Sequence, residues 1–281
     1  MAIPILKNWR TYFTQIDEGL GSSYERIVLN NKLLELCQKY QVKNLLESPS
    51  FGFTGISGIN SFAAAQNGIA TYLTDHDQAR IELIADFWSK YDNKCQINFV
   101  ANYADLPFAD QQFDLSWNFS ALWFTQDLSE ALAQMSRCTS KAIFICVPNR
   151  SGLGYLSQKL LGRKELAQQL NEANIIPQNI ISSLQDLGWN LVEQDFIDCP
   201  WWPDIGMPKA KFFKIFGLGW LFPQKSQPAI SIMDYYSGHD PKFPDKMLKH
   251  YWFEKIMPNF IKKFWAHHRY FLFEPTNNQR S

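Results

Sequence analysis

The chain has 281 residues, a length that suits one enlarged domain better than two full domains. Lysine and arginine number 27, as do aspartate and glutamate, so no net charge attracts the chain to nucleic acid. The hydrophobic fraction of 46% allows a substantial core. The five cysteines are scattered, without a CxxC pair or a Cys/His cluster. We therefore predict reduced thiols, no metal site and a cytoplasmic location.

The elements alternate along the chain, beginning with a helix over 29–40 whose leucines recur at helical spacing. Apolar runs predict strands over 42–47, 69–74, 97–101, 113–119, 142–147, 190–197 and 268–273. Helical patterns lie between them, over 78–90, 128–137 and 180–187, and a short helix ends at the Asn67-Gly68 pair. This alternation indicates an α/β fold, a doubly wound and mostly parallel sheet with helices on both faces.

Residues 101–117, ANYADLPFADQQFDLSW, form the most informative stretch of the chain. They consist of a polar turn, a Leu-Pro-Phe wedge, an acidic turn and an aspartate that enters an apolar strand. The same block lies between the third and fourth strands of class I S-adenosylmethionine (SAM)-dependent methyltransferases. The chain resembles that family, especially the methyltransferase type 11 branch with the quinone-biosynthesis enzymes. The resemblance covers residues 29–149 by motif and implies a seven-stranded Rossmann-like sheet, SAM as cofactor, and methyl transfer.

The resemblance also implies a set of cofactor-binding residues at the carboxyl ends of the strands. Asp75 ends the second strand where the family has a ribose-binding aspartate, and Asp77 is placed to cap the next helix. Asn102 and Tyr103 stand where the family brackets the adenine. The predicted cofactor-binding set is Glu47, Gly52, Gly55, Asp75, His76, Asn102, Tyr103 and Asn118.

The glycine loop after the first strand departs from the family pattern. Glu47 matches the acid that ends this strand, but the usual Glu-x-Gly-x-Gly-x-Gly does not follow. Pro49 and Phe51 occupy the first two glycine positions, and the glycines come later, three residues apart, at Gly52, Gly55 and Gly58. We expect this loop to be longer or differently folded than in relatives.

Two segments exceed a minimal sheet, and in related methyltransferases insertions at these places cover the pocket. We expect the following division: an N-terminal lid segment over 1–28, a SAM-binding core over 29–150, a helical insertion over 151–179, the end of the sheet over 180–198 and 267–274, an aromatic-rich lid over 199–266, and a flexible tail over 275–281. The lid would select the methyl acceptor.

Methyl transfer from a sulfonium mainly requires alignment and exclusion of water, so a general base is needed only if the acceptor must lose a proton. No specific catalytic motif is present. His267, before the last strand, and Asp204, in a Cys-Pro-Trp-Trp-Pro-Asp run, are the candidates for such a base.

The acceptor is expected to be a small or lipid-like molecule. Residues 242–269 hold seven lysines or arginines against two acids, interleaved with aromatic residues. They either pack as a lid with a solvated basic rim or make peripheral contact with an anionic membrane surface.

Two other readings compete with methyl transfer. One is a SAM-binding protein without turnover, motivated by the altered glycine loop and by Asn102. The other is a short-chain dehydrogenase using NAD(P), because Tyr155 and Lys159 have the Tyr-x-x-x-Lys spacing of that class. The Asn-Ala-Gly element expected in such a dehydrogenase is missing.

Overall fold

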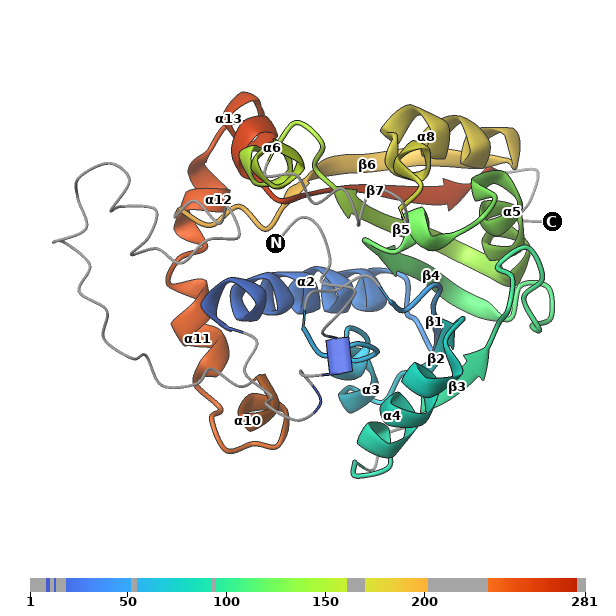
Figure 1. The fold of residues 1–281 in the computed structure, drawn as a ribbon, viewed down its shortest axis with the longest axis horizontal. Coiled ribbons are helices and arrows are strands. Elements are labelled where there is room, and N and C mark those ends of the chain that lie inside the picture. Colours follow the sequence, from blue (N-terminus) through green and yellow to red (C-terminus); the bar gives the residue numbers. More distant parts are fainter. Residues whose placement is uncertain are drawn as a thin grey trace, which may run out of the picture.

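A computed structural model describes residues 9–10, 13, 19–51, 55–91, 95–160, 170–201 and 232–276 of the chain. Seven strands form one sheet in the order β3-β2-β1-β4-β5-β7-β6 (Figure 1). The strands are β1 (Asn44–Glu47), β2 (Ala70–Asp75), β3 (Cys95–Phe99), β4 (Phe113–Phe119), β5 (Thr139–Pro148), β6 (Trp189–Ile197) and β7 (His268–Pro275). The first five are parallel, and β7 is antiparallel to both β5 and β6. The predicted sheet is confirmed.

The helices belong to two layers and a third group at the sheet edge. They are α2 (Gly19–Lys39), α3 (Phe62–Gln66), α4 (Gln78–Trp88), α5 (Leu128–Cys138), α6 (Leu153–Leu160), α8 (Pro177–Asp186), α10 (Ile232–Tyr236), α11 (Phe243–Leu248), α12 (Trp252–Ile256) and α13 (Asn259–Trp265), with 3-10 turns η1 (Leu122–Phe124) and η2 (Glu172–Ile175). None of the described helices has the length and apolar character needed to cross a membrane.

Strand β5 shows how the sheet is covered on both faces. Ala142, Phe144 and Cys146 pack in the core that contains α2, α3 and α4. Ile143 and Ile145, which alternate with them, pack in the core that contains α5 and α8. A strand buried on both sides needs apolar side chains at every position, which is why this segment reads as a continuous apolar run.

Helices α10 to α13 lie beyond the carboxyl ends of the parallel strands, at the left of Figure 1. Helix α11 packs against α2, and α13 packs against β6 and α6. Asn149, which follows β5, donates its side-chain amide to the carbonyls of Lys263 and Ala266 at 2.8 and 2.9 Å. The described part of the predicted lid therefore borders the edge where the cofactor is expected.

The elements differ from the prediction mainly at their ends. Helix α2 begins ten residues before residue 29, because residues 22–30 are buried under the sheet edge and its covering helices. Strand β3 begins at Cys95 and ends at Phe99, two residues earlier than predicted at each end. The predicted bounds of the fourth strand agree with β4.

Candidate cofactor site

The candidate site lies where β1 and β4 are neighbours in the sheet. Chain order runs outward in both directions from this point, through β2 and β3 on one side and through β5 on the other. In open α/β sheets, ligands bind beyond the carboxyl ends of the strands at such a switch point. Glu47, Asp75 and Asn118, three of the predicted residues, end or nearly end β1, β2 and β4. The topology therefore brings them to one edge.

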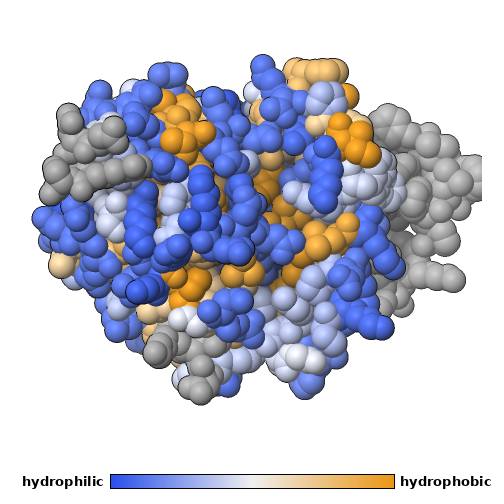
Figure 2. Space-filling view, turned by 180° about the vertical axis from the view of Figure 1, so that it is seen from behind, coloured by the Kyte–Doolittle hydropathy of each residue, from blue (hydrophilic) through white to orange (hydrophobic). Residues whose placement is uncertain are grey.

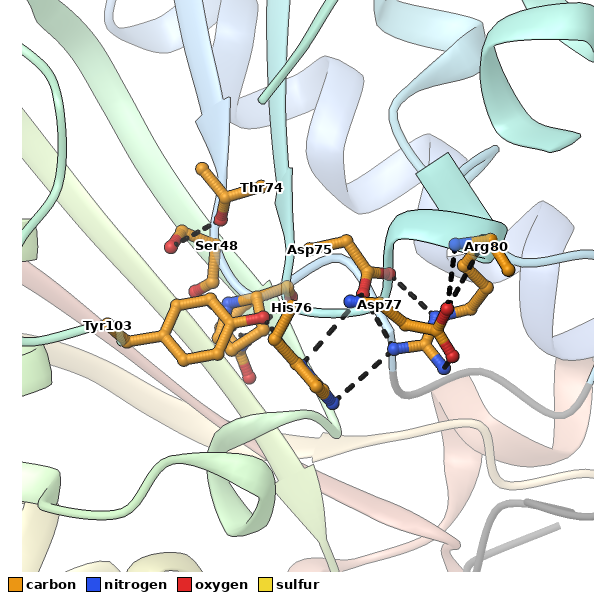
Figure 3. Close-up of polar contacts among 10 residues, drawn as sticks. Ser48, Thr74, Asp75, His76, Asp77, Arg80 and Tyr103 are labelled. Carbon is orange, nitrogen blue, oxygen red and sulfur yellow. Dashed lines mark hydrogen bonds and ion pairs between the residues drawn. The ribbon is translucent and has the colours of Figure 1, made fainter. Parts of the chain in front are cut away.

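Asp75 forms a buried ion pair with Arg80, which lies in the first turn of α4 (Figure 3). Oδ2 accepts from Arg80 Nε at 2.8 Å, and Oδ1 accepts from Arg80 Nη2 at 2.6 Å. Oδ1 also accepts from the backbone N–H of Asp77 at 2.9 Å. The side chains of Asp75 and Arg80 are 0% and 4% exposed, so both charges are withdrawn from water. Such a two-pronged pair is among the strongest hydrogen-bonded contacts in proteins.

Phe51 closes the other side of the Arg80 guanidinium. The guanidinium carbon lies 3.6 Å from the centroid of the Phe51 ring, a close cation–π contact. The Phe51 ring in turn packs on Phe124, with centroids 5.2 Å apart. Sequence reasoning missed Arg80. The available signal was an arginine five residues after the ribose-type aspartate, within the first turn of a helix capped by Asp77.

His76 and Tyr103 meet beside this pair. His76 Nδ1 lies 2.9 Å from the Tyr103 hydroxyl, and their rings meet edge to face. Burial lowers the pKa of His76, and burial raises the pKa of Tyr103 well above its usual value. Asn102 is exposed, and its Oδ1 accepts from the N–H of Ala104 at 3.0 Å. Three of the predicted residues thus lie together near the end of β2, with Tyr103 buried.

Glu47 is fully buried behind the loop that joins β1 to α3. Its two oxygens accept from Asn60 Nδ2 at 2.8 Å and from Ser61 Oγ at 2.6 Å. Burial raises the pKa of Glu47 to about 7, although these two hydrogen bonds favour its charged form. Asn118 ties the start of the same loop by donating to the carbonyls of Ser48 and Pro49, both at 3.0 Å. Both residues therefore shape the loop.

The end of the loop explains one of its glycines. Gly58 has φ 73°, and a Cβ there would lie 2.7 Å from the side chain of Ile84 on α4. Its carbonyl accepts from Trp88 Nε1 at 2.8 Å. Gly58 therefore lets the loop pack closely against α4, while Gly55 is buried. Gly52 lies outside the described residues.

Of the two candidates for a catalytic base, one lies among the described residues and the other does not. Asp204 lies outside the described residues. His267 is buried, and its Nδ1 lies 2.6 Å from Asp198 Oδ2. Burial alone would raise the pKa of Asp198, but the charge and hydrogen bond of His267 bring it below its ordinary value. This pair lies at the carboxyl end of β6 and the start of β7, on the β5 side of the switch point.

Residues 54–146 match the family model described as a methyltransferase domain. This match assigns residues 54–146 to a methyltransferase domain and supports the class I SAM-dependent family expected from the sequence. SAM is accordingly the cofactor of this methyltransferase. No curated protein is similar enough in sequence to match the chain.

Several solved structures share the fold of this methyltransferase. One is a putative methyltransferase in complex with the Haloferax volcanii Trm112 activator, with 13% identity and a TM-score of 0.50 over 84% of this chain and 82% of that one. The [4+2]-cyclase SpnF has 12% identity and a TM-score of 0.50 over 88% and 80%. Haemonchus contortus phosphoethanolamine N-methyltransferase 2, in complex with SAM, has 14% identity and a TM-score of 0.53 over 88% and 53%. At these identities the likeness concerns the fold.

The carboxylate of Asp75 offers the two acceptor oxygens that a ribose diol requires. A ribose diol offers two O–H donors on adjacent atoms, and Asp75 already receives two neighbouring N–H donors from Arg80, one on each oxygen. The carboxylate is therefore oriented for a paired donor. In this structure that donor is the guanidinium, so a nucleoside that used Asp75 would have to take the place of Arg80.

The dehydrogenase alternative has no support in the geometry. Tyr155 is 3% exposed and packs in the core with Leu122 and Trp123. Burial raises its pKa, whereas a catalytic tyrosine of that class needs a lowered one. Lys159 points to Glu172, with Nζ 2.8 Å from Oε2. Tyr155 therefore acts as a core residue.

Proposed function

We propose that this methyltransferase transfers the methyl group of SAM to a small, lipid-like acceptor that it meets at an anionic membrane surface. The observation that carries the proposal is a cluster of exposed apolar side chains on α6, α12 and α13. These helices border the carboxyl edge of the sheet, where the cofactor binds in this fold. The acceptor would therefore enter from the same end of the molecule.

The cluster, here called the apolar rim, stands out against the rest of the described surface. Among the described residues, nine large apolar side chains are exposed. Six of them form the apolar rim on these three helices: Leu153, Leu156, Trp252, Ile256, Phe260 and Phe264. Phe260 and Ile256 are 69% and 67% exposed. Figure 2 shows apolar side chains gathered at its upper right, the end of the molecule where α13 lies. Contiguous exposed apolar surface commonly marks an interaction site.

Basic side chains accompany the apolar rim. Lys249, Lys255 and Lys263 are exposed on or beside α11, α12 and α13. An interfacial surface combines apolar insertion with attraction to anionic headgroups, and each lysine near such a surface contributes about 1 kcal/mol. The rim therefore has the chemistry of an anionic lipid interface.

The reaction needs little more from the protein than placement. When bound, SAM supplies an activated methyl group, and the chain must hold the acceptor in line with it and exclude water. Asp75 and the Tyr103 turn would hold the nucleoside. The acceptor would lie on the β4 and β5 side, where the rings of Phe119 and His268 meet at a tilted angle with centroids 4.6 Å apart.

The test incubates the full chain with methyl-labelled SAM and either a total lipid extract or an aqueous metabolite extract. We expect label in the lipid fraction and co-flotation with anionic vesicles at low salt. Changing Phe260 and Phe264 together to serine should weaken vesicle binding at least tenfold, since burying each ring contributes about 1.5–3 kcal/mol. The control is Val192→Ser on edge strand β6, another exposed apolar position.

The outcomes separate the competing functions. Label confined to polar metabolites would refute the lipid-like acceptor and leave the methyltransferase intact. Binding of S-adenosylhomocysteine (SAH) by calorimetry, with no label transferred to either extract, would instead support a SAM-binding protein without turnover.

A further inference from the structure

A cavity of about 330 Å³ is lined by α2, the edge strand β6, the start of β7 and the helices α12 and α13. This volume is at the small end of the range for ligand pockets, so it suits a headgroup or a small metabolite. Asn31, Glu35 and Lys255 line the cavity and are exposed, so it opens to solvent. None of its lining residues belongs to β1, β2 or β4, and the cavity is therefore separate from the candidate cofactor site.

The lysines that line the cavity differ in how well their charges are paired. Lys32 Nζ lies 2.9 Å from Glu193 Oε1 and 3.2 Å from Glu35 Oε1, so its ammonium is well satisfied. Lys262 is only 11% exposed, yet its one ion pair within the described part of the chain, with Asp195 Oδ2, is 3.4 Å long. Strong hydrogen bonds between such charges measure about 2.7–2.9 Å. A nearly buried ammonium with one long contact favours a further anion.

Lys255 supplies a second ammonium that lacks an anionic partner. Among the described residues it forms no ion pair, and its Nζ lies 5.3 Å from the centre of the Tyr251 ring. The Tyr251 hydroxyl likewise makes no hydrogen bond to the part of the chain that the structure describes. Burial and neighbouring carboxylates raise the pKa of Tyr251 to about 12, so its hydroxyl keeps a proton to donate. Donors therefore gather in the cavity without enough acceptors.

We propose that this cavity binds a phosphate monoester, with Lys255 and Lys262 as its cationic partners and Tyr251 as a further donor. A phosphate monoester carries up to two negative charges and three strongly accepting oxygens, which match two ammonium groups and one hydroxyl. A carboxylate would bring one charge and two oxygens, so it matches this set less well. Lysine commonly binds phosphate as a point charge, without the fixed geometry of arginine.

The carboxylates around the cavity are compatible with an anion. Glu35 and Asp195 are already in contact with Lys32 and Lys262, and Glu35 is 64% exposed, so water and salt screen its charge. Glu254 is buried, and burial raises its pKa to about 7. At neutral pH it therefore carries a proton in a large fraction of molecules, and in that form it can donate to a phosphate oxygen.

The helices of the cavity also carry the apolar rim. On α13, Lys262 lines the cavity, whereas Phe260 and Phe264 are exposed in the rim. On α12, Lys255 lines the cavity beside the exposed Ile256. A lipid with its phosphate in the cavity would therefore place its acyl chains near the rim. This membrane source rests on the proposed function, whereas the phosphate site does not, because a soluble phosphate monoester would use the same donors.

The test is calorimetry on the full chain with two soluble probes, glycerol 3-phosphate and dihexanoyl phosphatidic acid below its micelle concentration. We expect one equivalent of dihexanoyl phosphatidic acid to bind per chain. Lys255→Met and Lys262→Met should each weaken binding at least about tenfold, because each removes a charged hydrogen-bond donor. The matched control is Lys246→Met, which removes the same charge from an exposed lysine that pairs with Asp240 outside the cavity. It should leave the affinity unchanged, and SAH binding establishes that each variant is folded.

The two probes distinguish the sources of the phosphate. Binding of dihexanoyl phosphatidic acid alone indicates a lipid, and equal binding of glycerol 3-phosphate indicates a soluble metabolite. Either result supports the site if both lysine variants weaken it. Equally tight binding of dihexanoyl phosphatidylcholine would overturn the proposal, as would no binding of either phosphate monoester or binding that both variants leave unchanged. Loss of vesicle flotation with intact probe binding would refute only the membrane surface of the proposed function.

Lysine labelling tests the site in the unaltered chain. Reductive methylation followed by mass spectrometry compares how fast Lys255 and Lys246 react with and without the probe that binds. With that probe at ten or more times its dissociation constant, labelling of Lys255 should slow at least about tenfold while that of Lys246 is unchanged. Equal rates of labelling at Lys255 with and without the probe would overturn the proposal.

Discussion

Replacing Arg80 with methionine would show whether the guanidinium competes with the cofactor for Asp75. Asp75 and Arg80 are almost completely buried and joined by two charge-assisted hydrogen bonds. Removing one member of a buried pair leaves the other charge uncompensated, which typically costs 3–5 kcal/mol. We therefore expect Arg80→Met to lower the free energy of unfolding of the ligand-free chain by about 3–5 kcal/mol.

The same change should strengthen cofactor binding. In the unaltered chain, a ribose that takes both oxygens of Asp75 must displace two hydrogen bonds from a charged donor, each contributing about 1.5–3 kcal/mol. If the hydrogen bonds of the diol offset only part of this loss, Arg80→Met should still bind SAH more strongly by about 1.4 kcal/mol or more. This corresponds to a dissociation constant for SAH that is at least tenfold lower. Calorimetry with SAH measures the affinity, and urea denaturation with and without SAH measures the stability.

Lys90→Met provides the control, because Lys90 pairs with Asp86 on the surface just past α4, where both side chains are more than 60% exposed. Such pairs contribute little, so neither affinity nor stability should change measurably. A folded Arg80→Met variant that binds SAH tenfold more weakly would refute the reasoning, because Arg80 would then contact the ligand. Unchanged stability would refute the buried pair itself.

Two further predictions concern the loop before α3. Gly58→Ala should lower the free energy of unfolding by about 2–4 kcal/mol, from its left-handed backbone and the collision with Ile84. Gly68 has φ 83° and no atom within 4 Å of a Cβ, so Gly68→Ala should lower the free energy of unfolding only by the cost of the left-handed backbone, about 1–2 kcal/mol. If urea denaturation shows equal losses for the two variants, the collision with Ile84 is excluded. Glu47 has a pKa raised to about 7, so its contribution to stability is fully present below about pH 4.5 and is lost as pH rises to 7. As pH rises through this range, the free energy of unfolding of Glu47→Gln should increase by up to about 3 kcal/mol relative to that of the unaltered chain. A difference between the two that does not change with pH would contradict the raised pKa.

The strands of the sheet were predictable from the sequence because their signals are local. Each strand is a short apolar run, and β4 begins and ends where the run from Phe113 to Phe119 does. Asp77 was predictable as the cap of α4 for the same reason, and its carboxylate accepts from the N–H of Ala79 and Arg80. Helix ends were less predictable, because the start of α2 is set by burial against distant segments.

The side-chain partners at the site were not predictable from local patterns. Asp75 was correctly placed at the end of β2, but its partner Arg80 depends on where Phe51 packs, and Phe51 lies in a loop without a regular pattern. The buried group of Glu25, Asp198 and His268, which meet beyond the end of the sheet, is a stronger case. Its members are separated by up to 243 residues, so no spacing rule applies to them. Their meeting follows from β7 lying between β5 and β6.

The altered glycine loop and the Arg80 contact have one physical explanation. Glycine at position 51 would leave room for backbone to approach a ligand, whereas Phe51 fills that room and stacks on a cation. The guanidinium compensates the charge of Asp75, and the ring covers the guanidinium. The buried charge of Asp75 is therefore offset within the chain itself, and a cofactor that used Asp75 would have to compete with Arg80. It follows that, if Asp75 binds the ribose of SAM as proposed, residues 51 and 80 affect the affinity for SAM as much as Asp75 does.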